Sequence, residues 1–141
     1  MLGEGGGVKR DVDHLRGCEG LVLGCPVYYG GPNGELLLYL DRMFFGAGRT
    51  VAHKPGAAVV SARRGGTTAA LDRLNKYFQI SQMPLVSSQY WNMVHGNTPQ
   101  EVAQDLEGLQ IMRTLGKNMA WLLQSLEAGK ASGVKLPEAE P

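Results

Sequence analysis

The sequence predicts an α/β domain in which helices cover both faces of a parallel sheet. Three short apolar runs predict its strands, and each run precedes a turn-rich segment and then apolar residues at helical spacing. The runs cover residues 21–25, 57–62 and 85–90. We expect one domain, because a chain of 141 residues has the usual size of one folding unit with one core.

The three runs differ in how deeply they should be buried. LVLGC and AAVVSA are almost continuously apolar, which predicts strands that are buried on both faces. The third run, LVSSQY, is more polar and favours an edge strand. Three strands in sequential order leave residues 21–25 on an open edge. Residues 1–16 offer glycine and charge with at most one short helix over residues 8–16. Either another chain or the opening strands of a longer domain should therefore cover that edge.

Two amphipathic helices are expected after the first two runs. Asn33 and Gly34 stand where a cap would precede the first helix. Thr67 or Thr68 can cap the second helix, which ends before Pro84. The apolar stripes consist of Leu36, Leu37, Leu40, Met43 and Phe44 in the first helix, and of Ala70, Leu71, Leu74, Tyr77 and Phe78 in the second.

The last helix has the clearest start signal in the chain. The sequence TPQE at residues 98–101 combines a capping box with a proline at the first helical position, and an apolar face continues to Gly129. A straight helix of this length would extend about 45 Å, more than twice a typical strand. We therefore expect a bend near Gly108 or Gly116, or an overhang beyond the sheet. Its stripe either packs on the core or forms a dimer surface that includes Met112, Met119 and Trp121.

Composition limits the classes of partner. The 14 basic and 13 acidic residues give a formal charge of +1, which does not favour nucleic acid or an anionic membrane. Cys18 and Cys25 match neither a disulfide scaffold nor a zinc motif, so we expect two reduced thiols. Residues 1–10 have no apolar core of a signal peptide, and no run is long enough to span a membrane. These features predict a cytoplasmic, soluble protein whose partner is a small molecule or another protein.

Three loops lie at the carboxyl ends of the predicted strands, where open parallel sheets bind ligands. Residues 26–34 bring two tyrosines and a glycine-rich backbone to a helix N-terminus, and residues 63–67 combine two arginines with glycines. Residues 91–96 add a tryptophan, an asparagine and a histidine. Each loop has an ordinary explanation by itself, since glycines form turns and arginines are commonly solvated. Together these groups suit a planar, electron-accepting ring that becomes anionic on reduction.

Three segments of the chain resemble a known family. They are GCPVYYGGPNGELLLYLDRMF, KPGAAVVSARRGGTTAALDRLNKYF and the stretch from MPLVSSQYWNMVHGNTPQEV to NMAWLL. In these segments the chain resembles the flavodoxin-like NADPH-dependent FMN reductases, which include multimeric flavodoxins and iron–sulfur flavoproteins. The resemblance implies a three-layer α/β/α fold truncated to strands 3-4-5 of the order 2-1-3-4-5. Residues 1–19 would form a glycine-rich start with a short helix, residues 20–129 a partial flavodoxin-like domain, and residues 130–141 a mobile tail.

The resemblance also implies a cofactor and its binding residues. FMN would lie between the three loops, with NADPH as the electron donor and with no catalytic side chain and no metal. Tyr28 and Tyr29 would flank the ring, amide groups of residues 63–66 would bond its carbonyl oxygens, and Asn92 and His95 would line the entrance. The implied binding residues are Pro26, Val27, Tyr28, Tyr29, Gly30, Asn33, Gly34, Ala62, Arg63, Arg64, Gly65, Gly66, Asn92 and His95.

The chain departs from the family pattern in two places. The first strand and the serine- and threonine-rich loop that holds the FMN phosphate have no counterpart here, which predicts weak FMN binding. A cysteine cluster for an iron–sulfur centre is also absent from the sequence. The leading hypothesis is a homo-oligomeric, FMN-dependent NAD(P)H oxidoreductase that passes electrons to a small acceptor such as a quinone or free flavin. The alternative is a noncatalytic chain with weak or no FMN binding, either a truncated flavodoxin-like fragment or a dimerisation module that pairs its open strand and long helix with another copy.

Overall fold

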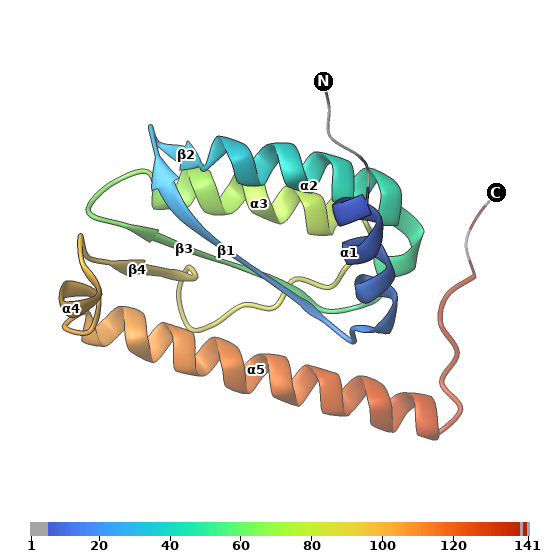
Figure 1. Ribbon diagram of the computed structural model, residues 1–141. Helices are drawn as coiled ribbons and strands as arrows, with labels where there is room; N and C mark the ends of the chain where they lie inside the picture. Colours follow the sequence, from blue (N-terminus) through green and yellow to red (C-terminus); the bar gives the residue numbers. More distant parts are fainter. Residues whose placement is uncertain (1–5, 139, 141) are drawn as a thin grey trace.

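The computed structural model describes residues 6–138 and residue 140. It has three layers, with helices α2 (Gly34–Ala47) and α3 (Thr67–Ile80) on one face of the sheet and α5 (Leu106–Ala131) on the other (Figure 1). The short helix α1 (Gly6–Gly17) packs against α2 and against the 3-10 turn η1 (Gly48–Val51). The predicted α/β/α architecture is confirmed, and the expected first helix is present as α1.

The sheet has four strands in the order β2-β1-β3-β4. Strands β1 (Leu21–Tyr28), β3 (Gly56–Ala62) and β4 (Met93–His95) are parallel, and their register aligns Cys25 with Val60 and Val60 with Met93. The two-residue strand β2 (Gly31–Pro32) runs antiparallel to the end of β1. This hairpin was not predicted, and it extends β1 three residues beyond the expected end at Cys25.

The third strand lies later in the chain than predicted. Residues 85–90 form only an isolated bridge from Leu85 to Gly56, whereas the strand itself is Met93–His95. Between them the Ser88 hydroxyl makes local hydrogen bonds to the Tyr90 carbonyl (2.6 Å) and to the Asn92 side chain (2.8 Å). Such local bonds compete with the strand ladder. The predicted strand over residues 85–90 was wrong. Its apolar residues indicated a strand, but the composition does not reveal that the Ser88 hydroxyl would bond to neighbouring groups of the same segment.

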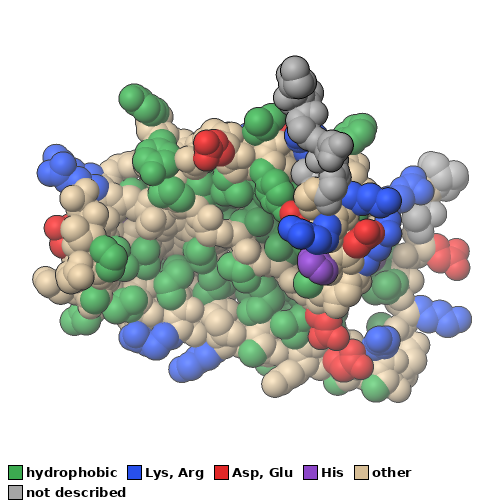
Figure 2. Space-filling view, in the orientation of Figure 1, with side chains coloured by type: hydrophobic (Ala, Val, Ile, Leu, Met, Phe, Trp, Pro, Cys, Tyr) green, Lys and Arg blue, Asp and Glu red, His purple; other side chains and the backbone are tan. Residues whose placement is uncertain are grey.

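Strand β1 is buried on one face only, which corrects the prediction of two buried faces. Leu23 and Cys25 are buried, whereas Val22, Gly24 and Pro26, which point the other way, are exposed. The reason is that α5 packs below β3 and β4, where its Leu115 joins Ala57 and Val86 in a small cluster. Strand β2 covers only the end of the outer edge of β1, so residues 21–26 have no neighbouring strand there among the described residues. Figure 2 shows hydrophobic side chains gathered on this side of the molecule.

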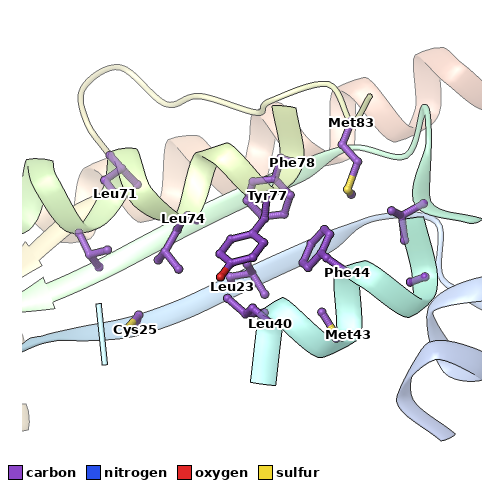
Figure 3. Packing of buried hydrophobic residues seen from close by; sticks show 14 of the residues in the cluster. Leu23, Cys25, Leu40, Met43, Phe44, Leu71, Leu74, Tyr77, Phe78 and Met83 are labelled. Carbon is purple, nitrogen blue, oxygen red and sulfur yellow. The ribbon is translucent and has the colours of Figure 1, made fainter. Parts of the chain in front are cut away.

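The main core lies between the sheet and helices α1, α2 and α3. Phe78, Leu40 and Leu74 are completely buried in it. The Phe44 ring centroid lies 5.2 Å from that of Tyr77 and 6.1 Å from that of Phe78, so the aromatic rings join α2 to α3 (Figure 3). These residues belong to the two predicted apolar stripes. The helical periodicity therefore identified the packing faces of α2 and α3 correctly.

The two helices begin differently. The Asn33 side chain accepts a hydrogen bond from the Leu36 amide (3.0 Å), which confirms the predicted cap of α2. At α3 the cap is Gly66 and neither of the predicted threonines. Gly66 has a φ of +91°, and an added Cβ would lie 2.8 Å from the Gly30 Cα. Glycine is required at this cap because the backbone is left-handed and the hairpin backbone packs directly on it.

The predicted last helix is divided into two helices. The TPQE signal begins only α4 (Pro99–Val102), with the Thr98 hydroxyl accepting from the Glu101 amide (3.2 Å). The chain then turns, and Asp105 caps α5 through the Gly108 amide (2.9 Å). The break therefore precedes both glycines that were expected to bend the helix. No residue of α5 after Leu115 is buried, and Trp121 is 68% exposed. The second half of α5 therefore extends beyond the core, which was one of the two predicted alternatives.

The described residues that follow α5 are all exposed. Helix α5 continues to Ala131, two residues into the predicted tail, and the mobility of residues 130–141 stays a prediction. Cys18 and Cys25 are free thiols, as expected. Within the described residues, no helix is both long and apolar enough to cross a membrane.

A hydroxyl network between α2 and α3 contributes stability that is lost at high pH. The Tyr77 hydroxyl donates to the Asp41 carboxylate and lies 3.1 Å from the Arg73 guanidinium. Burial raises the pKa of Tyr77 to about 12, and the hydrogen bond to Asp41 acts in the same direction. Since the pKa of an unfolded tyrosine is about 10, this contribution is present below pH 10 and is lost as the pH rises through 12.

We expect Tyr77→Phe to lower the free energy of unfolding by about 1 kcal/mol at pH 8. This difference should disappear near pH 12, because the wild type loses its contribution there and the variant has none to lose. Urea unfolding of both proteins between pH 8 and pH 12 measures the difference. Tyr39, whose pKa burial also raises to about 12, affects both proteins equally and cancels. A difference that stays constant over this range would contradict the prediction.

Candidate functional site

The carboxyl ends of the three parallel strands meet at one edge of the sheet. The register aligns Pro26 with Ser61 and Ser61 with Val94, so the segments that follow these strands leave the sheet side by side. In Figure 1 this is the left end of the molecule, opposite the C-terminal end of α5. The expected convergence of the three predicted segments is therefore present in the backbone.

The first segment is a tight hairpin and not the long loop expected from the sequence. Pro26, Val27 and Tyr28 lie within β1, and Tyr29 and Gly30 form the two-residue turn to β2. Both turn residues have positive φ angles, +49° and +76°, the pattern of a type I′ hairpin. The turn holds the Tyr29 side chain fully exposed, and Tyr28 is 56% exposed. Two aromatic side chains thus stand free at the edge of the sheet.

The second segment lies against this hairpin. Arg63, Arg64 and Gly65 are exposed, and neither arginine forms an ion pair with another described residue. An added Cβ on Gly66 would lie 2.8 Å from the Gly30 Cα and 2.9 Å from Val27 Cγ1. Gly30 and Gly66 are therefore in backbone contact without a side chain between them. The two predicted loops are therefore adjacent, and both carry exposed side chains.

Helix α3 begins at this surface with free amide groups. Its first intrahelical hydrogen bond runs from the Ala70 amide to the Gly66 carbonyl (3.1 Å), so the amides of residues 67–69 have no carbonyl partner within the helix. The first turn contains no acidic residue. The helix dipole adds positive potential at this end. The arrangement suits an acceptor oxygen or negative charge on a bound molecule.

The third segment contributes His95 but not the side chain of Asn92. His95 ends β4 beside Ala62, at the same edge, and is half-exposed. The Asn92 side chain is buried, where it accepts from the Ser88 hydroxyl (2.8 Å) and donates to the Val86 carbonyl (3.4 Å). Asn92 thus holds the segment before β4 in place. Its predicted place at an entrance is wrong for the side chain.

Asp105 was missed by the sequence interpretation. Its carboxylate accepts hydrogen bonds from the amides of Gly108 (2.9 Å) and His95 (2.7 Å), and lies 3.9 Å from His95 Nδ1. These bonds join the end of β4 to the start of α5. The Gly108 hydrogen bond and then that of His95 hold the pKa of Asp105 below its ordinary value, against the opposing effect of burial. An aspartate just before an apolar helical stripe is a cap signal that could have identified it.

We expect Asp105→Ala to lower the free energy of unfolding by about 1–2 kcal/mol at pH 7, because the cap of α5 is lost. Asp105→Asn should lose less, since its amide oxygen can still accept from Gly108. The lowered pKa means that the contribution of the carboxylate is present above about pH 4 and is lost as the pH falls below that. Urea unfolding at pH 7 and pH 2.5 checks both points. An undiminished wild-type advantage at pH 2.5 would contradict the charge argument.

The larger of two cavities in the structure lies away from the predicted site residues. One of about 990 Å³ lies between the C-terminal ends of α2 and α3 and the chain after α5, and none of the predicted site residues lines it. A small one of about 60 Å³ is lined by His95, Tyr90 and Asp105 among others. The surface formed by residues 28–30 and 63–66 is open and lines neither cavity.

Comparison with known sequences places this arrangement in context. The model of a family described as NADPH-dependent FMN reductase matches residues 3–98. The chain is also similar to an iron-sulfur flavoprotein of Methanocaldococcus jannaschii, with 29% identity over 129 residues. That match covers 83% of this chain and 67% of the relative.

Several solved structures share the fold. A WrbA-like flavodoxin from Agrobacterium tumefaciens matches with a TM-score of 0.55 and 17% identity, over 75% of this chain and 71% of that one. The Trp repressor binding protein from Bacillus subtilis matches with a TM-score of 0.61 and 15% identity, over 81% and 69%. The general stress protein 14 from Treponema denticola, solved in complex with FMN, has a TM-score of 0.51 and 15% identity, over 84% and 72%. At these identities the likeness shows a flavodoxin-like fold.

Proposed function

Since this chain belongs to the NADPH-dependent FMN reductase family, we propose that it is an FMN-dependent oxidoreductase that takes hydride from NADPH. The electrons would pass to a small acceptor such as a quinone or free flavin. One observation carries the proposal: the hairpin at Tyr29 and Gly30 packs directly on the cap of α3, beside exposed aromatic and basic side chains.

The residues at this edge fit a flat ring with carbonyl oxygens. Tyr28 and Tyr29 would cover its faces, and the backbone is open to close approach at Gly30 and Gly65, where an added Cβ would meet nothing within 4 Å. The free amides of α3 would donate to the carbonyl edge, and Arg63 and Arg64 would favour negative charge there. Bound FMN would supply the hydride chemistry, and the chain would supply position and electrostatics.

The described residues suit the ring better than its phosphate. The N-terminus of α2 is already capped by the Asn33 side chain, and Glu35 lies in its first turn. A negative side chain at that position disfavours a phosphate by charge repulsion. We therefore expect the ring to supply most of the binding energy, with an FMN affinity below that of proteins that clamp the phosphate.

A flavin titration tests the proposal directly. Quenching of FMN fluorescence by the wild-type chain should be saturable, and the complex should oxidise NADPH when a quinone is added. Replacing Arg63 and Arg64 together by glutamine should weaken FMN binding by about 3- to 10-fold, as expected for two exposed charges. Arg113→Gln, an exposed arginine on α5, is the control and should change affinity less than twofold. Absence of saturable binding to the wild type would refute the proposed function.

The alternative is a noncatalytic module that associates with another copy. It is favoured by the unpaired edge of β1 and by the exposed Trp121 on α5. Light scattering after size-exclusion chromatography measures the number of subunits, and the expected homo-oligomer would be contradicted by a monomer at high concentration. A dimer that binds no flavin would favour the alternative over the reductase.

A further inference from the structure

The cavity of about 990 Å³ has two separate walls. One wall is the C-terminal ends of α2 and α3, and the other is the chain that follows α5 (Figure 1). The helix wall is held together by a hydrogen bond from the His53 amide to the Gln82 carbonyl (2.9 Å). Ile80 on this wall is 85% exposed, and Leu136 on the other wall is 66% exposed. Closing the space would remove both apolar side chains from water, which is favourable.

The two walls also carry opposite charges. Arg49 lines the helix wall, is exposed, and forms no ion pair with another described residue. The chain after α5 contributes Glu138 and Glu140 to the opposite wall. Asp41 also lies on the helix wall, but its carboxylate is 3.7 Å from the Arg73 guanidinium. Arg49 is therefore available to a carboxylate from the facing wall.

The end of α5 gives the chain a defined direction. Gly133 has a φ of +85°, its amide donates to the Lys130 carbonyl (3.1 Å), and the Val134 amide donates to the Gly129 carbonyl (3.0 Å). Such a left-handed glycine ends a helix and turns the chain away from the helix axis. An added Cβ on Gly129 would lie 3.8 Å from the Val134 Cβ, so Val134 packs back on α5. Two residues later, Leu136 reaches the cavity.

We propose that residues 134–138 form a strap that closes on the ends of α2 and α3. Leu136 packs on Ile80 in the closed strap, and the Glu138 carboxylate pairs with Arg49. An exposed ion pair by itself contributes little, so the apolar contact drives closure and the ion pair fixes the position of the strap. Pro137, which lines the same space, has a fixed φ that reduces the entropy lost on closure. The strap is an alternative to the predicted mobile tail.

Backbone amide relaxation of the full chain, measured by NMR, tests the strap. Closure predicts an order parameter of about 0.85 for the Leu136 amide, whereas a flexible segment gives a value below about 0.6. Ile80→Ser should lower the order parameter at Leu136 to below about 0.6, because the apolar contact is lost. Leu38→Ser is the control, since Leu38 is also exposed but does not line the cavity. It should leave the order parameter unchanged.

Reversal of the two charges tests the ion pair. Arg49→Glu and Glu138→Arg should each lower the order parameter at Leu136, because each places like charges on facing walls. The double variant restores opposite charges and should recover at least half of the loss. Arg42→Glu, at an exposed arginine of α2 that does not line the cavity, should have no effect. A double variant that recovers nothing would overturn the pairing of Glu138 with Arg49.

Three other results would overturn the strap itself. One is a wild-type order parameter below about 0.6 at Leu136. Another is an ordered wild type that Ile80→Ser leaves unchanged, because the segment would then rest on a different surface. The third is order at Leu136 that disappears on dilution, because the segment would then bind another copy of the chain. These measurements need no flavin, so their failure leaves the proposed function intact.

Discussion

Phe78→Ala is expected to lower the free energy of unfolding by about 3–5 kcal/mol, the largest effect of a single core substitution in this chain. Phe78 is completely buried, and its ring lies between α3, the sheet and Phe44. An added Cβ on Gly56 would lie 2.5 Å from the Phe78 ring, so the ring packs directly on the β3 backbone. Its removal leaves a cavity that the rigid strand cannot fill.

Urea unfolding followed by circular dichroism measures this loss. Phe45→Ala is the matched control, because Phe45 lies on α2 and is 95% exposed. It should change the free energy of unfolding by less than about 0.5 kcal/mol. A loss below about 1.5 kcal/mol for Phe78→Ala would show that the core can collapse around the site, which would contradict the packing described here.

Gly66→Ala is expected to disturb both the fold and the site. A residue with a side chain is strained at a φ of +91°, and its Cβ would lie 2.8 Å from the Gly30 Cα. The left-handed backbone and the clash together should lower the free energy of unfolding by about 2–4 kcal/mol. Because the hairpin and the cap of α3 would be forced apart, FMN binding should weaken more than tenfold under conditions where the variant is folded.

The neighbouring glycine provides the control. An added Cβ on Gly65 would meet nothing within 4 Å, so Gly65→Ala should be almost as stable as the wild type. The two variants are compared by thermal unfolding and then by flavin titration at a temperature where both are folded. Equal FMN affinities in the two variants would contradict a binding surface that depends on the contact between Gly30 and Gly66.

The sequence alone determined the features that depend on local pattern. The helical spacing of apolar residues identified α2, α3 and the packing face that contains Leu40 and Phe78. The Asn33 cap was also predictable, because its side chain bonds to an amide three residues later. The convergence of the segments after β1, β3 and β4 followed from a general property of parallel sheets.

Only the tertiary structure decided the features that depend on distant contacts. Strand β4 is placed by its pairing with β3, and the break before α5 involves the hydrogen bond from the His95 amide to Asp105. The cap at Gly66 is set by the packing of Gly30, which lies in a different part of the chain. The open face of β1 depends on where α5 packs. The periodicity of apolar residues predicts which face of an element is buried, but it does not predict which other element packs on that face. For this reason the sequence predicted the sheet edge at which the three segments converge, and the fold was needed to show which of their side chains are exposed there.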